Sequence, residues 1–283
     1  MNIQWYPGHM TKARRMMEEN IRLIDLVIEL LDARAPLSSR NPDIDKLSQG
    51  KARLVLLNKA DLADARATAQ WETFFSREGI AVVTLDSRKR DEMKKLDAKV
   101  AEVCQKKIER DRKRGIKNRP VRAMVVGIPN VGKSTFINSY AKKAVAKTGN
   151  KPGVTKGKQW IKLSKTLELL DTPGILWPKF EDPEVGFHLA ALGSVNDQVV
   201  NTEELWSELL TYLKSSYAPL LKERYDMDAT GDNTLLMEAY CQKTGCLKTG
   251  GELDYYRASL LFLDDFRSGK IGKITLELPR END

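Results

Sequence analysis

The chain has 283 residues, 41% hydrophobic and 30% charged, a balance typical of a globular protein with one large domain or two smaller ones. It has no apolar run of the ~18 residues that a membrane span needs, no secretory signal in Met1 to Gly8, and three cysteines without a CxxC pair, so we expect a cytoplasmic protein without membrane partner, disulfide framework or zinc site. The net charge of +8 excludes no class of protein, but a basic surface commonly attracts a polyanion.

The first hundred residues alternate between predicted strands and helices. Three segments rich in Val, Leu and Ile are short enough for buried parallel strands, namely Leu26–Leu31, Arg53–Leu57 and Ile80–Leu85. A helix-compatible stretch, Ala65–Arg77, separates the second from the third. This alternation predicts an α/β sheet covered on both faces.

The middle of the chain adds one long helix and two more strands. The helix is predicted over Asp91–Lys113 and runs into a basic segment, Lys106–Arg119. The strands are predicted over Val121–Val126 and Thr166–Leu170, with a Gly/Lys-rich loop before the second.

The character of the sequence changes at about Trp177. Prolines there punctuate helical patterns such as Glu203–Ser216 and Tyr255–Arg267, and only Lys273–Leu278 alternates as a terminal strand would. We therefore expect a sheet domain at 1–176, with an N-terminal extension at 1–20, and a mostly helical domain at 177–283.

The charge is divided unevenly along the chain. Residues 1–120 hold 26 Lys and Arg against 18 Asp and Glu, residues 121–175 hold 10 against 2, and residues 176–283 hold 11 against 19. The first two segments are each net +8 and the last is net −8. This asymmetry favours a polyanion such as nucleic acid as partner, although a solvated lysine-rich surface gives the same count.

The motif Gly127-Ile-Pro-Asn-Val-Gly-Lys-Ser134 follows a predicted strand and precedes a predicted helix. It matches GxxxxGK[ST], whose backbone N–H groups close around phosphate oxygens. Lys133 would act catalytically by placing its charge on the β- and γ-phosphates, and the Ser134 hydroxyl suits Mg²⁺. The expected nucleotide contacts in this loop are Asn130, Val131, Gly132, Lys133, Ser134 and Thr135.

A second motif, Leu169-Leu-Asp171-Thr-Pro-Gly174, follows about forty residues later. A strand-end aspartate such as Asp171 holds the Mg²⁺ shell in P-loop enzymes, and Gly174 would place its N–H beside the γ-phosphate. Thr155 lies in a loop between the two motifs. We expect it to close onto Mg²⁺ when the γ-phosphate is present, as an ordered-or-disordered switch does.

The motif Asn58-Lys59-Ala60-Asp61 distinguishes guanine from adenine. The Asp61 carboxylate can accept two parallel hydrogen bonds from N1–H and the exocyclic amine of guanine, which adenine lacks. Asn58 would reach the other edge of the base and Lys59 would cover the ring. A further base-contacting loop is expected at Asp86-Ser87.

The order of these motifs is permuted, because the guanine motif precedes the phosphate loop. This order, with Asp32-Ala-Arg-Ala-Pro36, the N-terminal Trp5-Tyr-Pro-Gly-His9-Met and Asp171-Thr-Pro-Gly-Ile-Leu-Trp-Pro178, resembles the circularly permuted ribosome-assembly GTPases along nearly the whole chain. Permutation is tolerated because the termini of domains often lie close together.

The resemblance implies a Rossmann-like GTPase sheet, a helical RNA-binding domain, and a role in late maturation of the large (50S) ribosomal subunit. The implied partners are GTP or GDP and the large subunit with its rRNA, with no DNA. Because residues 176–283 are acidic, the charge count favours the GTPase domain and the N-terminal Lys12, Arg14 and Arg15 as the surface that faces the polyanion.

The side chain that would position the attacking water is not evident. GTPases often use a Gln just after the DxxG motif, where this chain has Ile175 and Leu176. The resemblance makes His9 the candidate, with an ordinary surface histidine as the alternative. It also implies that Asn130 helps bind K⁺ beside the phosphates, unless that side chain only braces the loop.

We therefore predict a GTP hydrolase, slow alone, whose turnover is stimulated by the large subunit and drives release from it. Two alternatives remain open: a nucleotide-gated RNA-binding scaffold with negligible turnover, and a GTPase that assists RNA modification. The first is allowed by the missing Gln. The second has no methyl-donor or metal constellation in the sequence to support it.

Overall fold

The computed structural model describes residues 15–116, 119–141, 159–171, 182–228 and 230–280. They form two compact units, which we call the sheet unit (described residues 15–171 and 277–280) and the helical unit (182–276). None of the helices in these ranges has the length and hydropathy needed to span a membrane.

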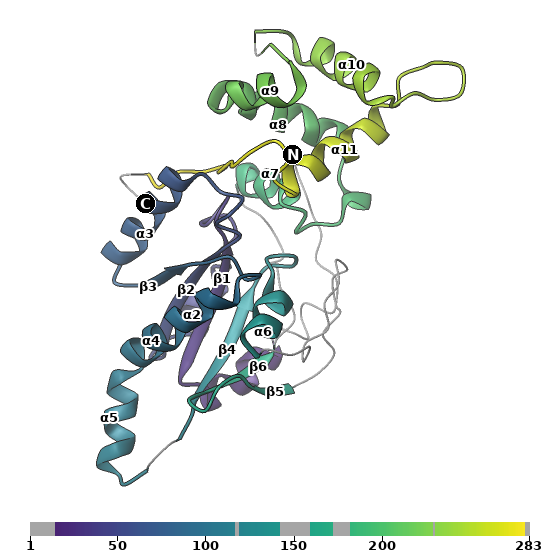
Figure 1. The fold of residues 1–283 in the computed structure, drawn as a ribbon. Coiled ribbons are helices and arrows are strands. Elements are labelled where there is room, and N and C mark those ends of the chain that lie inside the picture. The colour runs from purple at the N-terminus through teal and green to yellow at the C-terminus, as the bar shows by residue number, and fades with distance from the viewer. Residues whose placement is uncertain (1–14, 117–118, 142–158, 172–181, 229, 281–283) are drawn as a thin grey trace. The chain divides into compact units, whose positions relative to one another are not determined.

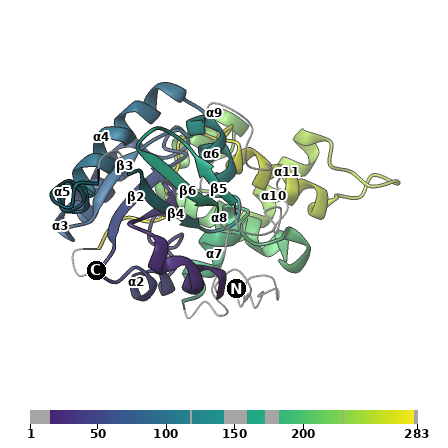
Figure 2. The same ribbon diagram turned by 90° about the horizontal axis from the view of Figure 1, so that it is seen from below.

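The sheet unit is built on six strands in the order β3-β2-β1-β4-β6-β5 (Figure 1). Only the pairing of β5 with β6 is antiparallel. The strands twist relative to one another, as Figure 2 shows from below. Their bounds are β1 Leu26–Asp32, β2 Ala52–Asn58, β3 Ala81–Thr84, β4 Val121–Gly127, β5 Gln159–Lys162 and β6 Leu167–Asp171.

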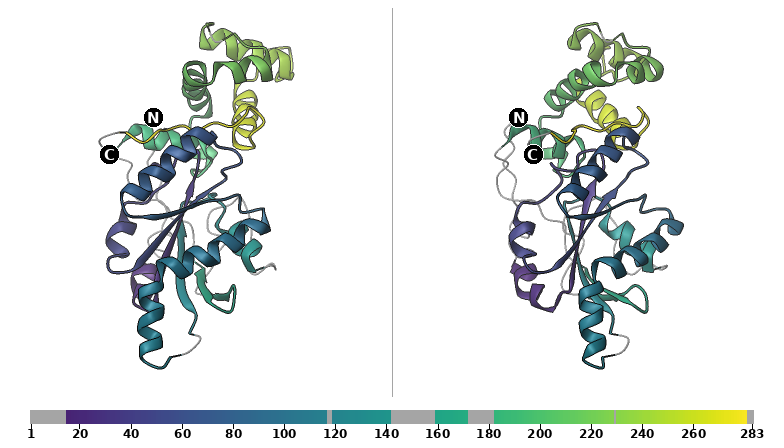
Figure 3. Two further views of the ribbon diagram at one scale, coloured as in Figure 1. Left: turned by 60° about the vertical axis from the view of Figure 1, so that its left-hand side comes forward. Right: turned by 90° about the vertical axis from the view of Figure 1, so that its left-hand side faces the viewer.

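Helices lie on both sides of this sheet (Figure 3), as expected for parallel strands buried on both faces. The helices α2 and α3 lie on one side and α4 and α6 on the other, where Tyr140 of α6 donates a hydrogen bond to Asp97 of α4. The helical segments are η1 Ile21–Leu23, α2 Asp43–Leu47, α3 Ala65–Arg77, η2 Arg90–Glu92, α4 Met93–Val103, α5 Gln105–Lys113 and α6 Lys133–Ala141.

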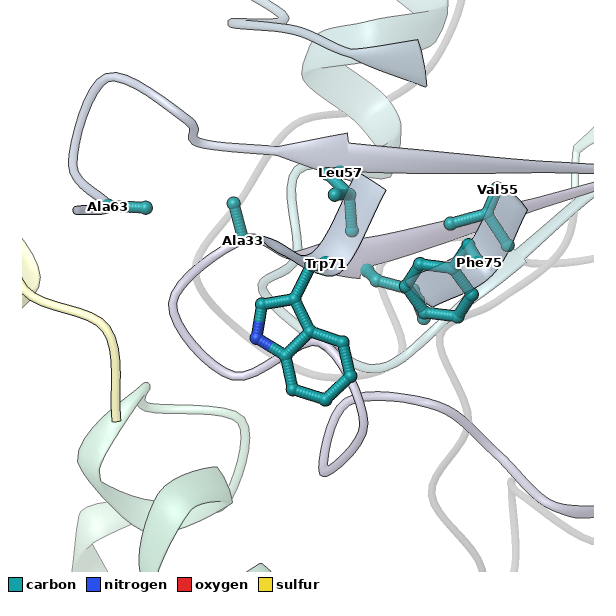
Figure 4. Packing of buried hydrophobic residues seen from close by; sticks show 7 residues of the cluster. Ala33, Val55, Leu57, Ala63, Trp71 and Phe75 are labelled. Atoms are coloured by element: carbon teal, nitrogen blue, oxygen red, sulfur yellow. The ribbon is translucent and has the colours of Figure 1, made fainter. Parts of the chain in front are cut away.

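The packing of α3 shows how sequence periodicity becomes core. Trp71 and Phe75, one helical turn apart, are fully buried and face Val55 and Leu57, which alternate on β2 (Figure 4). The side chain of Asp64 accepts hydrogen bonds from the N–H groups of Arg66 and Ala67 and so caps the helix.

The helical unit has an aromatic core. Trp206, Tyr225, Tyr240 and Phe262 form a ring cluster with centroid separations of 5.2 to 5.7 Å. The unit's helical segments are α7 Pro183–Ala191, η3 Asp197–Val199, α8 Thr202–Ser216, α9 Ala218–Tyr225, α10 Asn233–Thr244 and α11 Tyr255–Arg267.

The predicted fold class, a P-loop type α/β sheet followed by a mostly helical part, is confirmed. The predicted helix over 91–113 is two helices that meet at Cys104. The predicted strand over 273–278 is wrong: the carbonyl of Thr275 accepts hydrogen bonds from the hydroxyls of Tyr212 and Tyr217 instead of pairing with a strand.

Candidate functional site

The carboxyl ends of neighbouring strands bring three distant loops to one edge of the sheet. Asp32 at the end of β1 is in register with Asn58 at the end of β2, and Leu30 of β1 is in register with Gly127 at the end of β4. The loop after β3, which holds Ser87, lies at the same edge because β3 pairs in parallel with β2. Ligands of open α/β sheets bind at this edge.

Asn58 ties these loops together. Its Nδ2 donates to the carbonyl of Val131 at 2.7 Å, and its Oδ1 accepts from Ser87 N at 3.1 Å and Ser87 Oγ at 2.6 Å. Both ends of the amide are thus engaged by protein groups, and the reach of Asn58 to the base edge stays a prediction, because Nδ2 carries a second N–H group. Asn58 is buried, so the link fixes the loop after β3 against the phosphate loop.

Two glycines give the phosphate loop its path. A Cβ at Gly127 would lie 2.7 Å from the carbonyl oxygen of Leu30, and one at Gly132 would lie 2.4 Å from Asn58 Nδ2. Gly132 also has φ +101°, and Asn130 lies in the left-handed region at +59°. Each close approach therefore requires a residue without a side chain.

The helix α6 begins directly after this turn, at Lys133. Its first N–H groups have no partner within the helix and carry the positive end of the helix dipole, an arrangement that binds phosphate. Ser134 and Thr135 occupy the next two positions, both half-buried. The loop and helix terminus together have the form of a phosphate-binding site.

Asp61 lies in the loop after β2 and meets Arg88 from the loop after β3. The Arg88 guanidinium contacts Asp61 Oδ2 and also donates to both oxygens of Asp86, at 2.9 and 3.0 Å. Hydrogen bonds from Arg88 outweigh burial and hold the pKa of Asp86 below its usual value. The sequence did not predict a role for Arg88. The one signal for it was its position two residues after Asp86.

Lys59, at φ +59°, is held by a buried ion cluster. Its Nζ lies 2.9 Å from Asp32 Oδ2, and Arg34 makes a two-point contact with Asp32 at 2.9 Å each. Burial alone raises the pKa of Asp32, but the two cations outweigh it and lower the pKa well below the usual value. Asp32 and Arg34 therefore fix the position of Lys59 at the end of β2.

Residues 277–280 return to the sheet unit beside this cluster. The Glu277 carboxylate accepts hydrogen bonds from Leu37 N, from Ser38 N at 2.9 Å and from Ser38 Oγ at 2.5 Å. Its carbonyl accepts from Trp71 Nε1 at 3.0 Å. Residues 277–280 thus belong to the sheet unit, whereas the sequence boundary places them in the helical domain.

Several predicted site residues lie outside the described residues: His9, Thr155, Gly174, Lys12 and Arg14. Asp171 is the last residue of β6, next to the phosphate-loop strand β4. The predicted Mg²⁺ ligands, hydroxyl and carboxylate oxygens, are the donors that a hard cation takes, and Ser134 at the start of α6 is the one whose surroundings are described. The described residues contain no cluster of three or more His, Cys, Asp or Glu that could hold a metal.

Comparison with known proteins agrees with this geometry. A family model described as 50S ribosome-binding GTPase matches residues 122–226. Ribosome biogenesis GTPase A of Bacillus cereus is 48% identical over 282 residues, covering 99% of this chain and 95% of that protein. The Thermotoga maritima protein of the same name is 32% identical, covering 99% and 95%.

Solved structures give the same result. The crystal structure of GNP-bound YlqF from T. maritima matches with a TM-score of 0.67 at 28% identity, over 95% of this chain and 99% of that one. A GDP-bound YlqF structure matches with a TM-score of 0.69, also at 28% identity, over 94% and 99%. With the permuted motif order and the near full-length identity, these matches show that the chain belongs to the ribosome biogenesis GTPase A family and is a GTP hydrolase.

Proposed function

We propose that this GTPase binds immature large ribosomal subunits in the cytoplasm and promotes a late assembly step, and that subunit-stimulated GTP hydrolysis releases it. The observation that carries the proposal is the Asn58 link between the guanine and phosphate loops, in a chain 48% identical over nearly its full length to a ribosome biogenesis GTPase. The family model's description as a 50S ribosome-binding GTPase supports the same partner.

The chain's own residues would do three things to GTP. Asp61 would accept the paired N–H groups of guanine, the N–H groups at the start of α6 would bind the β-phosphate, and Lys133 would bridge the β- and γ-phosphates. Water then attacks the γ-phosphorus, and the bond to the β–γ bridging oxygen breaks. Preorganised positive charge accounts for most of the catalysis expected in phosphoryl transfer.

Two cations complete this proposed site. Ser134, Thr155 and Asp171 would hold Mg²⁺, which when bound neutralises charge on the phosphate oxygens. Asn130 would help bind K⁺; its exposed position in the phosphate loop is compatible with this role. His9, at the permuted N-terminus, would orient the attacking water.

The partner is argued from charge and relatives. Residues 1–175 carry a net positive charge, whereas 176–283 carry a net charge of −8, so the sheet unit offers the stronger attraction to rRNA phosphates. A relative from Ictalurus punctatus, 33% identical over 96% of this chain, is also named as a ribosome-associated GTPase, of mitochondria.

Phosphate release from GTP tests the proposal, measured with and without large ribosomal subunits in K⁺ and in Na⁺ buffer. We expect stimulation by the subunits, a lower rate in Na⁺, and loss of stimulation in His9→Ala. Stimulation that survives His9→Ala would remove His9 from the mechanism. Absence of any stimulation would contradict the proposal and favour the nucleotide-gated scaffold.

A further inference from the structure

The outer face of α5 carries a row of cations that the nucleotide site does not use. Lys106, Arg110, Lys113 and Arg114 are spaced by four, three and one residues, all are exposed, and with Glu109 they line a shallow hollow of about 430 Å³. We call these four cations the α5 stripe. In Figure 1, α5 extends below the strands.

The inner face of the same helix fixes the direction of the stripe. Lys107 pairs with Asp111 at 3.1 Å and with Asp25 at 3.7 Å, and all three side chains are nearly buried. Cys104, at the start of the helix, is buried as well. This side of α5 packs against the rest of the sheet unit, so the α5 stripe on the opposite side faces outward.

The stripe cations form no close ion pair with any residue that the structure describes. Among the residues that the structure describes, none of the four takes part in an ion pair or side-chain hydrogen bond, and the neighbouring Glu109 accepts from Gln105 at 2.8 Å. Unpaired cations concentrated on one rigid face make a local positive potential.

Helix stability accounts for only part of the stripe. Cations near the C-terminus of a helix are favourable to its dipole, which explains Arg110, Lys113 and the C-cap Arg114, but Lys106 lies in the first turn, where a cation is unfavourable. The first turn contains no acidic residue to offset it. Lys106 is thus placed against local helix energetics.

We propose that the α5 stripe docks on the phosphate backbone of structured RNA. The stripe spans ~12 Å along the helix, which lets it face several phosphates, and contacts of this kind position a protein without reading sequence. A lipid surface is the less suitable anionic partner, because a membrane-surface helix needs a broad apolar face opposite its cations. The choice of RNA rests on the proposed function.

A charge-matched pair of variants tests this proposal. The stripe variant is K106Q/R110Q/K113Q/R114Q. The control variant, K46Q/R66Q/R77Q/K95Q, removes four exposed cations of the same unit that are scattered over other helices and make no ion pair among the described residues. Both lose four charges, so only the position differs.

The measurement is the affinity for a fluorescent RNA duplex of ~20 base pairs at ~50 to ~200 mM KCl. We expect the stripe variant to bind at least ~10-fold more weakly and to lower the slope of log K against log salt by ~3, since each lost phosphate contact removes nearly one unit. The control variant should keep most of the wild-type slope. GTP affinity should stay unchanged in both, which shows that they are folded.

Equal weakening of both variants would show a diffuse charge effect and overturn the proposal, as would wild-type affinity in the stripe variant or tighter binding to anionic vesicles than to RNA. Subunit-stimulated GTP hydrolysis separates the two proposals. If the subunits stimulate hydrolysis while the stripe variant keeps its RNA affinity, the proposal for the α5 stripe is wrong and the proposed function stands. If wild type shows no stimulation but the stripe variant loses RNA, the proposed function fails alone.

A second inference concerns Arg88. Guanine offers Asp61 an N–C–N edge with donors on both nitrogens, and a guanidinium group has the same donor array. Arg88 contacts Asp61 through one such nitrogen and is retained by both oxygens of Asp86. The Asp86 contacts would keep Arg88 nearby once guanine takes its place on Asp61.

We infer that Arg88 stands in for guanine on Asp61 while the site is empty and must leave it when the base enters. Arg88 is 65% exposed and the Asp61 side chain 21%, so the contact is weak enough for a ligand to displace. Such competition lowers the apparent affinity for guanine nucleotides by slowing association, without affecting the rate of dissociation.

GDP binding to Arg88→Ala and Lys89→Ala tests this inference by stopped-flow fluorescence. Lys89 is the adjacent exposed cation, with its nearest carboxylate, Glu92, at 4.0 Å. We expect Arg88→Ala to bind GDP ~2- to 5-fold more tightly through faster association, the size of an exposed ion pair, and Lys89→Ala to match wild type. Unchanged or weaker binding in Arg88→Ala would overturn the inference.

Discussion

The two units use their buried polar groups differently. In the sheet unit several such groups lie at the ends of strands: Asp32 and Arg34 support Lys59, and Asn58 joins three loops. In the helical unit they hold helices to one another, as when Ser259 of α11 donates a hydrogen bond of 2.9 Å to Thr202 of α8.

We interpret the first arrangement as serving ligand recognition and the second as serving helix packing. Parallel strands place their carboxyl ends at one edge, where polar side chains can converge on a ligand. In the helical unit the apolar faces of the helices pack into an aromatic core. The polar contacts between these helices therefore serve to fix their packing. We therefore expect damage to the sheet unit's edge to change nucleotide binding, and damage to the helical core to change stability alone.

The largest expected effect is on base recognition. In Asp61→Asn, one carboxylate oxygen that would accept from guanine becomes a donor, so one hydrogen bond of the pair is replaced by a clash between two donors. GTP affinity should fall ~1,000-fold or more, as measured by calorimetry. Xanthosine triphosphate, which has a carbonyl in place of the exocyclic amine, should bind this variant better than GTP; an unchanged preference for GTP would refute the role of Asp61.

Truncation in the helical core should have the next largest effect. Trp206 is fully buried against Tyr240 and Phe262, so Trp206→Ala should cost about 4 kcal/mol of that unit's stability.

Burial raises the pKa of the Cys104 and Cys241 thiols to about 11, so both should react slowly with a thiol reagent near neutral pH. In the variant, Cys241 should become reactive while Cys104 stays protected and GDP binding persists; loss of GDP binding would show that the units are not independent.

The ion cluster under Lys59 should show an intermediate effect. Asp32→Asn removes the carboxylate that Arg34 and Lys59 both contact at the buried end of β1, which should cost about 3 kcal/mol. The pKa of Asp32 is lowered in the folded state, so its contribution is present above its unfolded pKa and is lost as pH falls through the folded one. Urea titrations of both proteins near neutral pH and in acid should therefore converge as the pH falls; a constant difference would contradict this assignment.

The smallest effect is expected at the link between loops. Ser87→Ala removes the 2.6 Å hydrogen bond from Oγ to Asn58 but keeps the one from the backbone N–H. The loss of about 1 kcal/mol should appear as ~5-fold weaker GDP binding. Ser76→Ala, which removes an exposed helix hydroxyl that bonds only its own turn, is the control and should bind GDP as wild type does.

Local patterns predicted much of this molecule. The strands and most helices follow from periodicity, and the glycines at 127 and 132 mark a turn that only glycine fits. The strand predicted over 273–278 was wrong because apolar alternation does not require a partner strand: Ile274, Thr275 and Leu276 are all buried, and the carbonyl of Thr275 is satisfied by tyrosine hydroxyls.

Contacts between distant residues could not be predicted in this way. Asn58 and Val131 are 73 positions apart, and Ser38 and Glu277 are 239 apart. Motif logic assigned Asn58 to the ligand and did not predict that its amide also joins two other loops. The Arg88 contacts with Asp61 and Asp86 depend on the pairing of β2 with β3. The sequence predicts an α/β sheet but not which strands pair in it.

The affinity of the protein for large ribosomal subunits, compared between its complexes with a non-hydrolysable GTP analogue and with GDP, tests the central claim most directly. Nucleotide-controlled release predicts that the analogue complex binds at least ~10-fold more tightly, a coupling of ~1.4 kcal/mol. The Asp61→Asn variant should lose this difference at guanine-nucleotide concentrations that saturate wild type. Equal affinity of the two wild-type complexes would contradict the account.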